Sequence, residues 1–333
     1  MTKIEFADGL PLPVDAATQT FGFLARKRGG KSYAAGKLVE GLHAHGVQFV
    51  VLSPLPNWFG LRLAADGKPP GIDVPLLGGL RGDIPLSPDA GRLVADAVID
   101  TGRSFVLDVS QFSLGERKRF ATAFGEQLWQ RQKAQHDPRP IHVVLEEAQL
   151  FLPQQIFKGD EHMVGIWTEI VRLGGNMGIG VSLISQRPQS VAKEALTQVE
   201  CLVVLQVNGV PEKKALKEWI VEKGGDTDLL NELPFLKPGE AYVWSPQWLE
   251  HFGRHKILPK WTFDSGMTPK VGAKRAAQVP LRPIDLDALR AQMAEATKKA
   301  EEHDVGALRR RIRELEARLA KPSMSDQQLE AAR

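Results

Sequence analysis

Short apolar runs bounded by turn residues alternate with longer helical patterns between residue 20 and about residue 265. Buried strands of a parallel sheet read as continuous apolar runs, whereas the helices between them read as longer amphipathic segments. The alternation therefore predicts an α/β domain with a mostly parallel sheet. The predicted strands are 20–25, 47–52, 103–108, 141–145, 180–185 and 201–207, and the predicted helices between them include 32–45, 116–135 and 161–173.

Two parts of the chain depart from this alternation. Residues 54–90 are rich in proline and glycine, so we expect them to form an irregular insertion. From residue 270 onward the chain is polar, rich in alanine and arginine, and almost free of aromatic residues. We therefore expect one α/β domain over residues 1–265 and a helical tail over residues 266–333.

Two helices are predicted in the tail, over residues 286–299 and 305–320. In the second, apolar residues recur at alternating steps of four and three, which is the spacing of a coiled-coil seam. A pattern of about two heptads is equally compatible with a single amphipathic helix packed on the domain. The apolar residues of this pattern are Leu308, Ile312, Leu315 and Leu319.

The composition is that of a soluble globular protein, with 43% hydrophobic and 25% charged residues among 333. No apolar run approaches the roughly 18–20 residues that span a bilayer, and the first residues lack the apolar stretch of a signal peptide. The single cysteine, Cys201, excludes an internal disulfide framework and a multi-cysteine zinc site. We expect a cytoplasmic protein without membrane association. Its net charge of +3 neither requires nor excludes nucleic acid as a partner.

The sequence A-R-K-R-G-G-K-S, residues 25–32, follows a predicted strand and opens a predicted helix. This is the context of the phosphate-binding P-loop, G-x-x-x-x-G-K-[ST], here with Ala25 at the first position. Backbone N–H groups and the helix N-terminus would bind phosphates, Lys31 would neutralise the β- and γ-phosphate oxygens, and Ser32 would ligate Mg²⁺. A solvated basic turn is the alternative. The predicted nucleotide-binding residues are Arg26, Lys27, Arg28, Gly29, Gly30, Lys31, Ser32 and Tyr33.

The predicted strand 141–145 ends in two glutamates, Glu146 and Glu147. An apolar strand that delivers acids to the sheet edge beside a P-loop has the form of a Walker B segment. Glu146 would hold Mg²⁺, usually through water, and Glu147 would orient and deprotonate the attacking water. An acidic helix N-terminus that suits the helix dipole is the alternative, but it explains one glutamate better than two.

The predicted strand 180–185 ends in Gln186 and Arg187. The amide of Gln186 would sense the γ-phosphate or position the attacking water. Arg187 and Arg172 are candidates for stabilising charge across a subunit boundary. For Arg187, a surface arginine beside a proline that ends the strand is the alternative.

These motifs resemble, in their order and spacing, the HerA/FtsK superfamily of P-loop ATPases, and within it the HerA-type ATP-binding domain. The resemblance covers about residues 20–210. It implies a RecA-like core, a hexameric ring with ATP hydrolysis at the subunit interfaces, and DNA that is pumped or unwound through the pore. The residues that carry it are A-R-K-R-G-G-K-S, V-V-L-E-E-A-Q and G-N-M-G-I-G-V-S-L-I-S-Q-R-P-Q-S.

The resemblance also assigns roles to single residues. Lys31 and Ser32 match the Walker A pair of the family, Glu146 and Glu147 match the Walker B pair, and Gln186 matches the sensor position. A common position of the family's arginine finger holds a glycine in this chain, so Arg172 or Arg187 would have to replace it. HerA helicases also usually carry an N-terminal β-barrel, whereas only about 20 residues precede the first predicted strand here.

We therefore expect an ATP-hydrolysing, ring-forming DNA translocase or helicase-type motor that uses ATP and Mg²⁺. The alternative is a nucleotide-dependent oligomeric scaffold that docks an effector protein through its tail with little DNA translocation. A P-loop kinase is a weaker third reading because no phosphate-acceptor site is recognisable in the sequence. DNA-stimulated ATP turnover distinguishes the motor from the scaffold.

Overall fold

The computed structural model describes residues 3–223, 227–266 and 286–303, and the chain divides into two units, Met1–Leu286 and Asp287–Arg333. Of the second unit the structure describes helix α8 (Asp287–His303), which corresponds to the helix predicted at 286–299. The predicted helix at 305–320 and its apolar pattern lie outside the described residues. No helix of the described part is long and apolar enough to cross a membrane.

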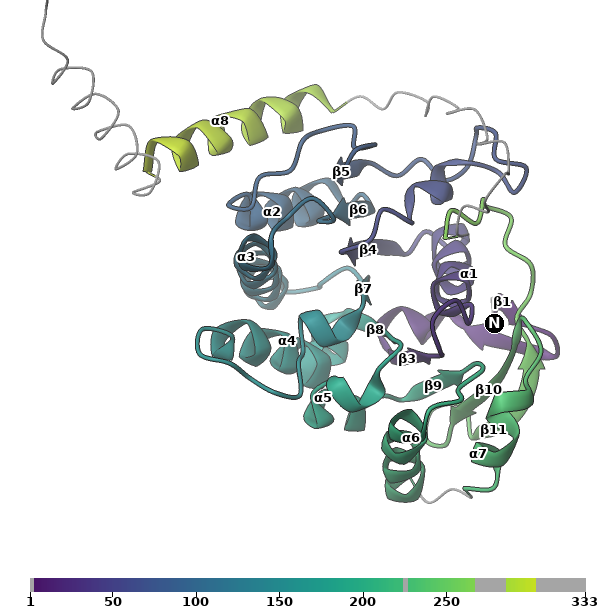
Figure 1. The fold of residues 1–333 in the computed structure, drawn as a ribbon. Helices are drawn as coiled ribbons and strands as arrows, with labels where there is room; N and C mark the ends of the chain where they lie inside the picture. The colour runs from purple at the N-terminus through teal and green to yellow at the C-terminus, as the bar shows by residue number, and fades with distance from the viewer. Residues whose placement is uncertain (1–2, 224–226, 267–285, 304–333) are drawn as a thin grey trace, which may run out of the picture. The chain divides into compact units, whose positions relative to one another are not determined.

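A twisted sheet forms the centre of the first unit (Figure 1). All neighbouring strands from β9 to β5 are parallel, and only β10 and β11 add antiparallel pairs at one edge. The sequence prediction of a mostly parallel sheet is therefore confirmed. In sheet order the strands are β11 (His251–Lys256), β10 (Glu240–Ser245), β9 (Cys201–Val204), β3 (Thr20–Leu24), β8 (Ile179–Ser185), β7 (Ile141–Glu146), β4 (Gln48–Ser53), β6 (Phe105–Asp108) and β5 (Leu76–Gly78).

Helices cover both faces of this sheet (Figure 1). One face holds α1 (Lys31–Ala44) and a hairpin of β1 (Lys3–Ala7) and β2 (Leu10–Pro13), while α2, α3 and α4 lie on the other face. The remaining helices are α2 (Gly91–Thr101), α3 (Leu114–Lys133), α4 (Glu161–Leu173), α5 (Lys193–Thr197), α6 (Val210–Glu222) and α7 (Leu229–Glu232), with short 3-10 helices η1 (Val14–Thr18), η2 (Phe59–Arg62), η3 (Ala148–Leu150), η4 (Gly174–Met177), η5 (Pro188–Ser190) and η6 (Leu233–Phe235).

Aromatic side chains fill the core on both faces. On the α1 side, Phe21 and Phe23 of β3 are fully buried, with ring centroids 5.9 Å apart. On the other side, Phe124 of α3 stacks on Trp167 of α4 at 6.4 Å, and the Trp167 indole donates to the carbonyl of Ala121 at 3.2 Å. Full burial of one such side chain contributes about 1.5–3 kcal/mol, so both helical layers are held firmly to the sheet.

The start of α3 shows how local sequence sets a helix boundary. The Ser113 hydroxyl accepts from the backbone N–H of Glu116 at 3.4 Å, and the Glu116 carboxylate accepts from the backbone N–H of Ser113 at 2.8 Å. This capping box satisfies two donors that the first helical turn leaves unpaired. The helix therefore begins at Leu114, two residues before the predicted start.

The segment 54–90, expected to be irregular, contributes η2 and the edge strand β5. Arg62 and Asp83 form an ion pair at 2.6 Å, and Asp83 also accepts from the backbone N–H of Leu76 at 2.8 Å. This ion pair and hydrogen bond hold the start of β5 in place. With three residues, β5 is too short to be recognised in the sequence from a hydrophobic pattern.

The sequence also left two pairs of strands unassigned. Residues 3–13, which precede the first predicted strand, form the β1–β2 hairpin, and β10 and β11 extend the sheet beyond the predicted strands. The domain boundary predicted at residue 265 borders residues outside the described part and stays a prediction.

Candidate nucleotide-binding site

The loop between β3 and α1 is a tight turn built on glycines. Gly30 has a φ of 88° and stands immediately before α1. A Cβ on Gly29 would lie 2.7 Å from the Cβ of Ala25 and 2.9 Å from the carbonyl oxygen of Arg26, so a larger residue does not fit there. Ala25 itself has no positive φ, so an alanine is tolerated at the first P-loop position.

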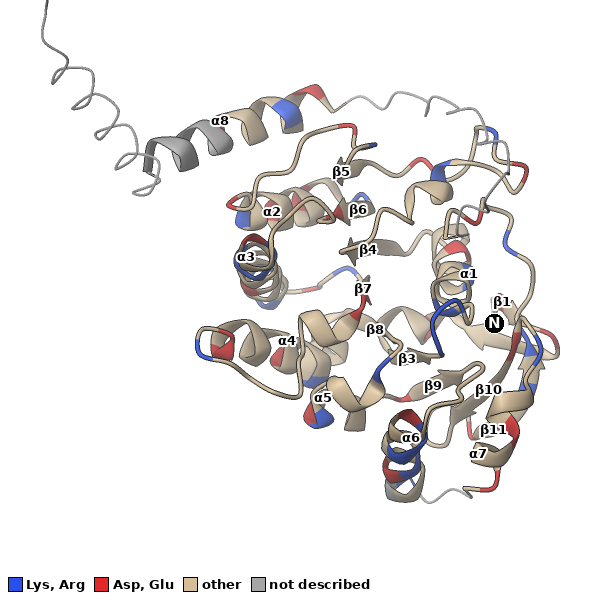
Figure 2. Cartoon of the chain, viewed as in Figure 1, with Lys and Arg blue, Asp and Glu red and all other residues tan. Residues whose placement is uncertain are grey.

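Positive charge and unpaired N–H groups gather at this turn. Figure 2 shows the basic residues of the loop at the start of α1 and the acidic end of β7. The backbone N–H groups of the first helical turn have no partner within the helix, and the helix dipole adds partial positive charge there. Loop and helix end together form the kind of site that binds phosphate groups.

Lys31, Ser32 and Glu146 converge beside this loop. Lys31 is buried, and burial lowers the pKa of its amine while the nearby carboxylates of Glu146 and Glu147 oppose that shift. The Ser32 hydroxyl donates to Glu146 Oε1 at 2.8 Å, and the indole N–H of Trp58 donates to Oε2 at 3.2 Å. Three of the four predicted Walker residues are therefore in direct contact or electrostatically coupled.

The Ser32 and Glu146 oxygens suit magnesium. Adjacent oxygen ligands of an octahedral Mg²⁺ lie roughly 2.9 Å apart when each bond is about 2.0–2.1 Å, and the observed separation is 2.8 Å. Among the described residues no group of three or more His, Cys, Asp or Glu side chains could hold a metal ion. Mg²⁺ at phosphate sites takes one or two protein carboxylates and completes its shell with water and phosphate, so this donor set fits.

Burial raises the pKa of Glu146 to about 7, although the hydrogen bond from Ser32 and the charge of Lys31 oppose the shift. Between its ordinary value of 4.5 and about 7, the folded protein holds a proton that the unfolded chain has released. We therefore expect the free energy of unfolding of the nucleotide-free protein to fall by about 3 kcal/mol as the pH rises through this window. Urea unfolding at several pH values, with Glu146→Gln as the comparison, measures this; parallel curves for the two proteins contradict it.

Glu147 is held by a chain of hydrogen bonds that reaches the end of β8. Its backbone has a left-handed conformation, with a φ of 54° and a ψ of 54°. Gln149 Nε2 donates to Glu147 Oε2 at 2.6 Å, and Gln149 Oε1 accepts from the Ser185 hydroxyl at 2.8 Å. The Ser185 oxygen in turn accepts from the backbone N–H of Arg187 at 3.0 Å. The second glutamate is thereby tied to the strand end that carries Gln186.

Gln186 and Arg187 line a cavity of about 170 Å³ together with Arg26 and Lys27 of the loop. The structure thus brings these four predicted residues together. It does not bring Arg172 to them, since Arg172 lies at the end of α4 and pairs with Glu194 at 3.1 Å.

Tyr33 lines a second cavity of about 320 Å³ next to Gly30. The Tyr33 hydroxyl accepts from the backbone N–H of Lys260 at 2.9 Å, which ties α1 to the segment after β11. Burial lowers the pKa of the Lys260 amine, which lies 5.6 Å from the centre of the Tyr33 ring. The cavity is completed by Leu205, Pro238, Gly239, Lys256, Ile257, Pro259 and Asp264.

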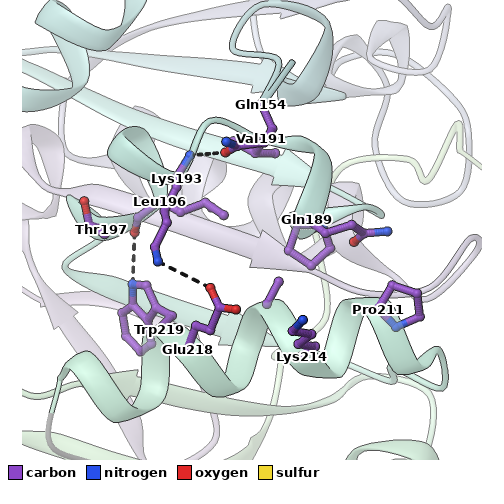
Figure 3. Close-up of a pocket in the computed structure, with 12 residues that line it drawn as sticks. Gln154, Gln189, Val191, Lys193, Leu196, Thr197, Pro211, Lys214, Glu218 and Trp219 are labelled. Carbon is purple, nitrogen blue, oxygen red and sulfur yellow. Dashed lines mark hydrogen bonds and ion pairs between the residues drawn. The ribbon is translucent and has the colours of Figure 1, made fainter. Parts of the chain in front are cut away.

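A third cavity, of about 340 Å³, lies between η5, α5 and α6 (Figure 3). Its wall includes Gln189, whose Nε2 donates to Glu212 Oε1 at 3.3 Å and whose buried oxygen has no hydrogen-bond partner among the described residues. Trp219 closes one end by donating to the carbonyl of Leu196 at 3.0 Å. Glu212 of α6 lines the cavity of Gln186, so its hydrogen bond with Gln189 links the walls of the two cavities.

Three residues that contact the predicted site were missed by the sequence reading: Trp58, Gln149 and Lys260. Trp58 lies in the segment expected to be irregular, and Lys260 lies more than 200 positions from Tyr33. Gln149 belongs to the motif V-V-L-E-E-A-Q, and its place two residues after Glu147 was the only available signal.

Part of this chain is similar in sequence to known proteins. No protein-family model matches the chain. The chain is 28% identical over 106 residues to the probable DNA double-strand break repair helicase HerA of Methanocaldococcus jannaschii, a match that covers 32% of this chain and 20% of the relative. It is 32% identical over 106 residues to the DNA double-strand break repair helicase HerA of Pyrococcus furiosus, covering 31% of this chain and 18% of the relative. The matched part thus spans about a fifth of these relatives.

The fold has solved counterparts. The bacterial conjugative coupling protein TrwB superposes with a TM-score of 0.55 at 10% identity, over 80% of this chain and 91% of the other. A second structure of TrwB, in complex with the non-hydrolysable GTP analogue GDPNP, gives the same TM-score at 11% identity. At such identities the likeness concerns the fold, which is the RecA-like P-loop fold expected from the motifs. Together with the partial matches to HerA helicases, this fold supports assignment of the chain to the HerA/FtsK superfamily of P-loop ATPases.

Proposed function

We propose that this protein is an ATP-hydrolysing, ring-forming motor that moves or unwinds DNA. The observation that carries the proposal is the convergence of a buried lysine, a hydroxyl and a carboxylate at the N-terminus of α1. Lys31 is 7% exposed, and Ser32 and Glu146 lie 2.8 Å apart beside it. The similar HerA proteins are known or probable DNA double-strand break repair helicases, which supports DNA as the substrate that the motor acts on.

In the proposed mechanism the loop N–H groups and Lys31 bind the β- and γ-phosphates. Ser32 and Glu146 would hold Mg²⁺, which supplies a Lewis acid for the phosphate oxygens. Glu147 accepts the proton of the water that attacks the γ-phosphorus, and the bond to the β–γ bridging oxygen breaks. Gln186, at the end of β8, orients that water or contacts the γ-phosphate.

The cavity beside Tyr33 is the proposed place of the nucleoside. It begins at Gly30, next to the phosphate loop, and its volume of about 320 Å³ lies within the usual range for small-molecule sites, roughly 300–1,000 Å³. The aromatic ring of Tyr33 and the apolar side chains of Leu205 and Ile257 suit a planar base.

Completion of the site by a neighbouring subunit is part of the proposal. The charge that develops on the transferred phosphoryl group needs a cation besides Lys31. Arg187 and Arg172 are both exposed, and the resemblance suggests that one of them serves the adjacent protomer of a hexamer. Arg172 must leave its surface pair with Glu194 to do so, which costs little because exposed ion pairs contribute about 0–1 kcal/mol.

Gln149 acts as a positioning residue for Glu147 in this proposal. We expect Gln149→Leu to lower kcat by about 10- to 100-fold and to leave nucleotide affinity unchanged, because the hydrogen bonds of the amide go to Glu147 and Ser185. Steady-state turnover and direct nucleotide binding measure the two effects. Gln130→Leu, on the exposed face of α3, is the control. Equal losses in kcat and in affinity would instead indicate a general disturbance of the fold.

ATP turnover with Mg²⁺, with and without double-stranded DNA, tests the proposed function. We expect DNA to stimulate turnover in the wild type and to have no effect in Glu147→Gln. Chromatography in the presence of ATP tests ring formation separately. Turnover that ignores DNA, or nucleotide binding without turnover, contradicts the motor and favours the nucleotide-dependent scaffold with a docked partner.

A further inference from the structure

Two histidine side chains of β11 converge outside the nucleotide site. His251 Nε2 and His255 Nε2 lie 2.8 Å apart, and the ring centroids are 4.9 Å apart. Residues 251, 253 and 255 share one face of the strand because side chains alternate between the two faces. Gly253 stands between the rings. A Cβ there would lie 2.8 Å from His255 Nε2 and 3.1 Å from His251 Nε2, so a side chain at this position would force the two imidazoles to move from this arrangement.

The hydrogen bond of His255 prepares its other nitrogen for a ligand. His255 Nδ1 lies 2.8 Å from the carbonyl oxygen of Asp8, in the turn of the β1–β2 hairpin. A carbonyl oxygen only accepts, so Nδ1 carries the hydrogen and Nε2 of the neutral ring presents a lone pair. Metal-binding histidines characteristically donate their second ring N–H to a carbonyl or carboxylate in this way.

His251 supplies the second nitrogen. Burial and the neighbouring His255 ring lower the pKa of His251, which favours its neutral form near pH 7. Without an ion, one Nε2–H donates to the other Nε2. Because both nitrogens point at the same small volume, replacing that shared hydrogen with a cation needs only a small rotation of the two rings.

We propose that His251 and His255 bind one divalent transition-metal ion, with Zn²⁺ as the representative ion. Two nitrogens bound to one ion at about 2.0–2.1 Å lie roughly 2.9–3.4 Å apart for bond angles between 90° and 109°, close to the observed 2.8 Å. Imidazole nitrogens suit Zn²⁺, Ni²⁺ and Cu²⁺, whereas Mg²⁺ prefers oxygen ligands. The described residues add no third His, Cys, Asp or Glu ligand, so water or a group from another molecule completes the coordination.

This site is separate from the proposed ATPase chemistry. Neither histidine lines the cavities of Gln186 or of Tyr33, and β11 is the edge strand of the sheet, where both rings are half-buried and reachable by solvent. The proposal therefore goes beyond the proposed function, and failure of one leaves the other standing.

The test is a calorimetric titration of the untagged, metal-free protein with Zn²⁺. We expect one Zn²⁺ per chain, unaffected by excess Mg²⁺. Loss of a residue that only hydrogen-bonds to a metal ligand lowers metal affinity by about 10- to 100-fold. His251→Ala and His255→Ala each remove a ligand itself, so we expect each to lower the affinity for Zn²⁺ by about 100-fold or more. Gly253→Ala keeps both imidazoles but separates them, and about a tenfold loss is expected. His162→Ala, at an exposed position of α4, is the control.

Melting curves of the metal-free variants establish that each is folded. Zn²⁺ should raise the melting temperature of the wild type and leave that of His251→Ala and His255→Ala unchanged. The nitrogen NMR signals of both imidazoles should shift on addition of Zn²⁺, with His255 in the Nδ1–H form. Absence of Zn²⁺ binding by the folded wild type would leave the pair as an ordinary hydrogen bond and overturn the proposal. Equal affinity of the wild type and Gly253→Ala would overturn it as well, because convergence of the nitrogens would then have no role.

Discussion

Replacing Glu147 with glutamine is expected to reduce the turnover of ATP by about 10²- to 10⁴-fold, the usual contribution of a positioned general base. The amide cannot accept a proton from water, but it keeps the size of the carboxylate and can still accept the hydrogen bond that Gln149 donates. Because the Ser32 hydroxyl donates to Glu146, affinity for nucleotide should stay within a few-fold of the wild type in the Glu147 variant. Steady-state hydrolysis and equilibrium binding of a fluorescent ATP analogue measure the two quantities.

Glu161→Gln is a matched control for this variant. Glu161 is exposed in the first turn of α4, and its carboxylate accepts from the backbone N–H of Gly159 at 2.7 Å, a bond that a glutamine oxygen can also accept. Its turnover should equal that of the wild type. If Glu147→Gln hydrolyses ATP as fast as Glu161→Gln, Glu147 is not the base and the proposed mechanism fails at that step.

Replacing Lys31 with alanine is expected to weaken binding of ATP by about 30-fold to several thousand-fold, which corresponds to a loss of about 2–5 kcal/mol for a buried charged partner. The amine lies at the start of α1 and is only 7% exposed, so water cannot replace it easily. Its removal also leaves Glu146 and Glu147 without the nearby positive charge, and their negative charge then repels the phosphates. Isothermal titration with ATP and Mg²⁺ measures the loss.

Lys37→Ala provides a control of the same residue type on the same helix. Lys37 is 8% exposed and lies 3.7 Å from Glu40, on the part of α1 that follows the phosphate loop. We expect Lys37→Ala to lower stability without changing the affinity of the folded protein for ATP. Equal affinities for Lys31→Ala and Lys37→Ala would show that the loop is not the phosphate cradle.

The strands of the parallel sheet were predictable because each is a continuous apolar run between turn residues. The apolar run at 201–207 shows the limit of this prediction. Strand β9 ends at Val204, although Leu205 and Val207 are also buried. Hydrophobicity reports burial, whereas the strand end depends on where the ladder with β3 stops. In the same way β5 escaped prediction, since a strand of three residues, Leu76–Gly78, has no periodicity to detect.

The candidate nucleotide site was predictable in its parts. Gly29, Gly30, Lys31 and Ser32 are consecutive, and their proposed function depends on the conformation of one turn. Glu146 could be joined to them because strand ends of a parallel sheet meet at one edge. The roles of Gln186, Arg187 and Arg172 stay predictions, although the structure brings Gln186 and Arg187 to the cavity beside the loop.

The sequence by itself determined the properties that residues next to one another in the chain can encode: the α/β alternation, the phosphate loop and the acidic end of β7. Only the tertiary structure decided which side chains meet, because sheet order and side-chain packing bring together residues whose separation in the chain follows no pattern. Trp58 reaches Glu146 across 88 positions, and Gln149 reaches Ser185 across 36. The histidines of β11 are near in sequence, yet their convergence depends on Gly253 between them and on a carbonyl 247 positions from His255.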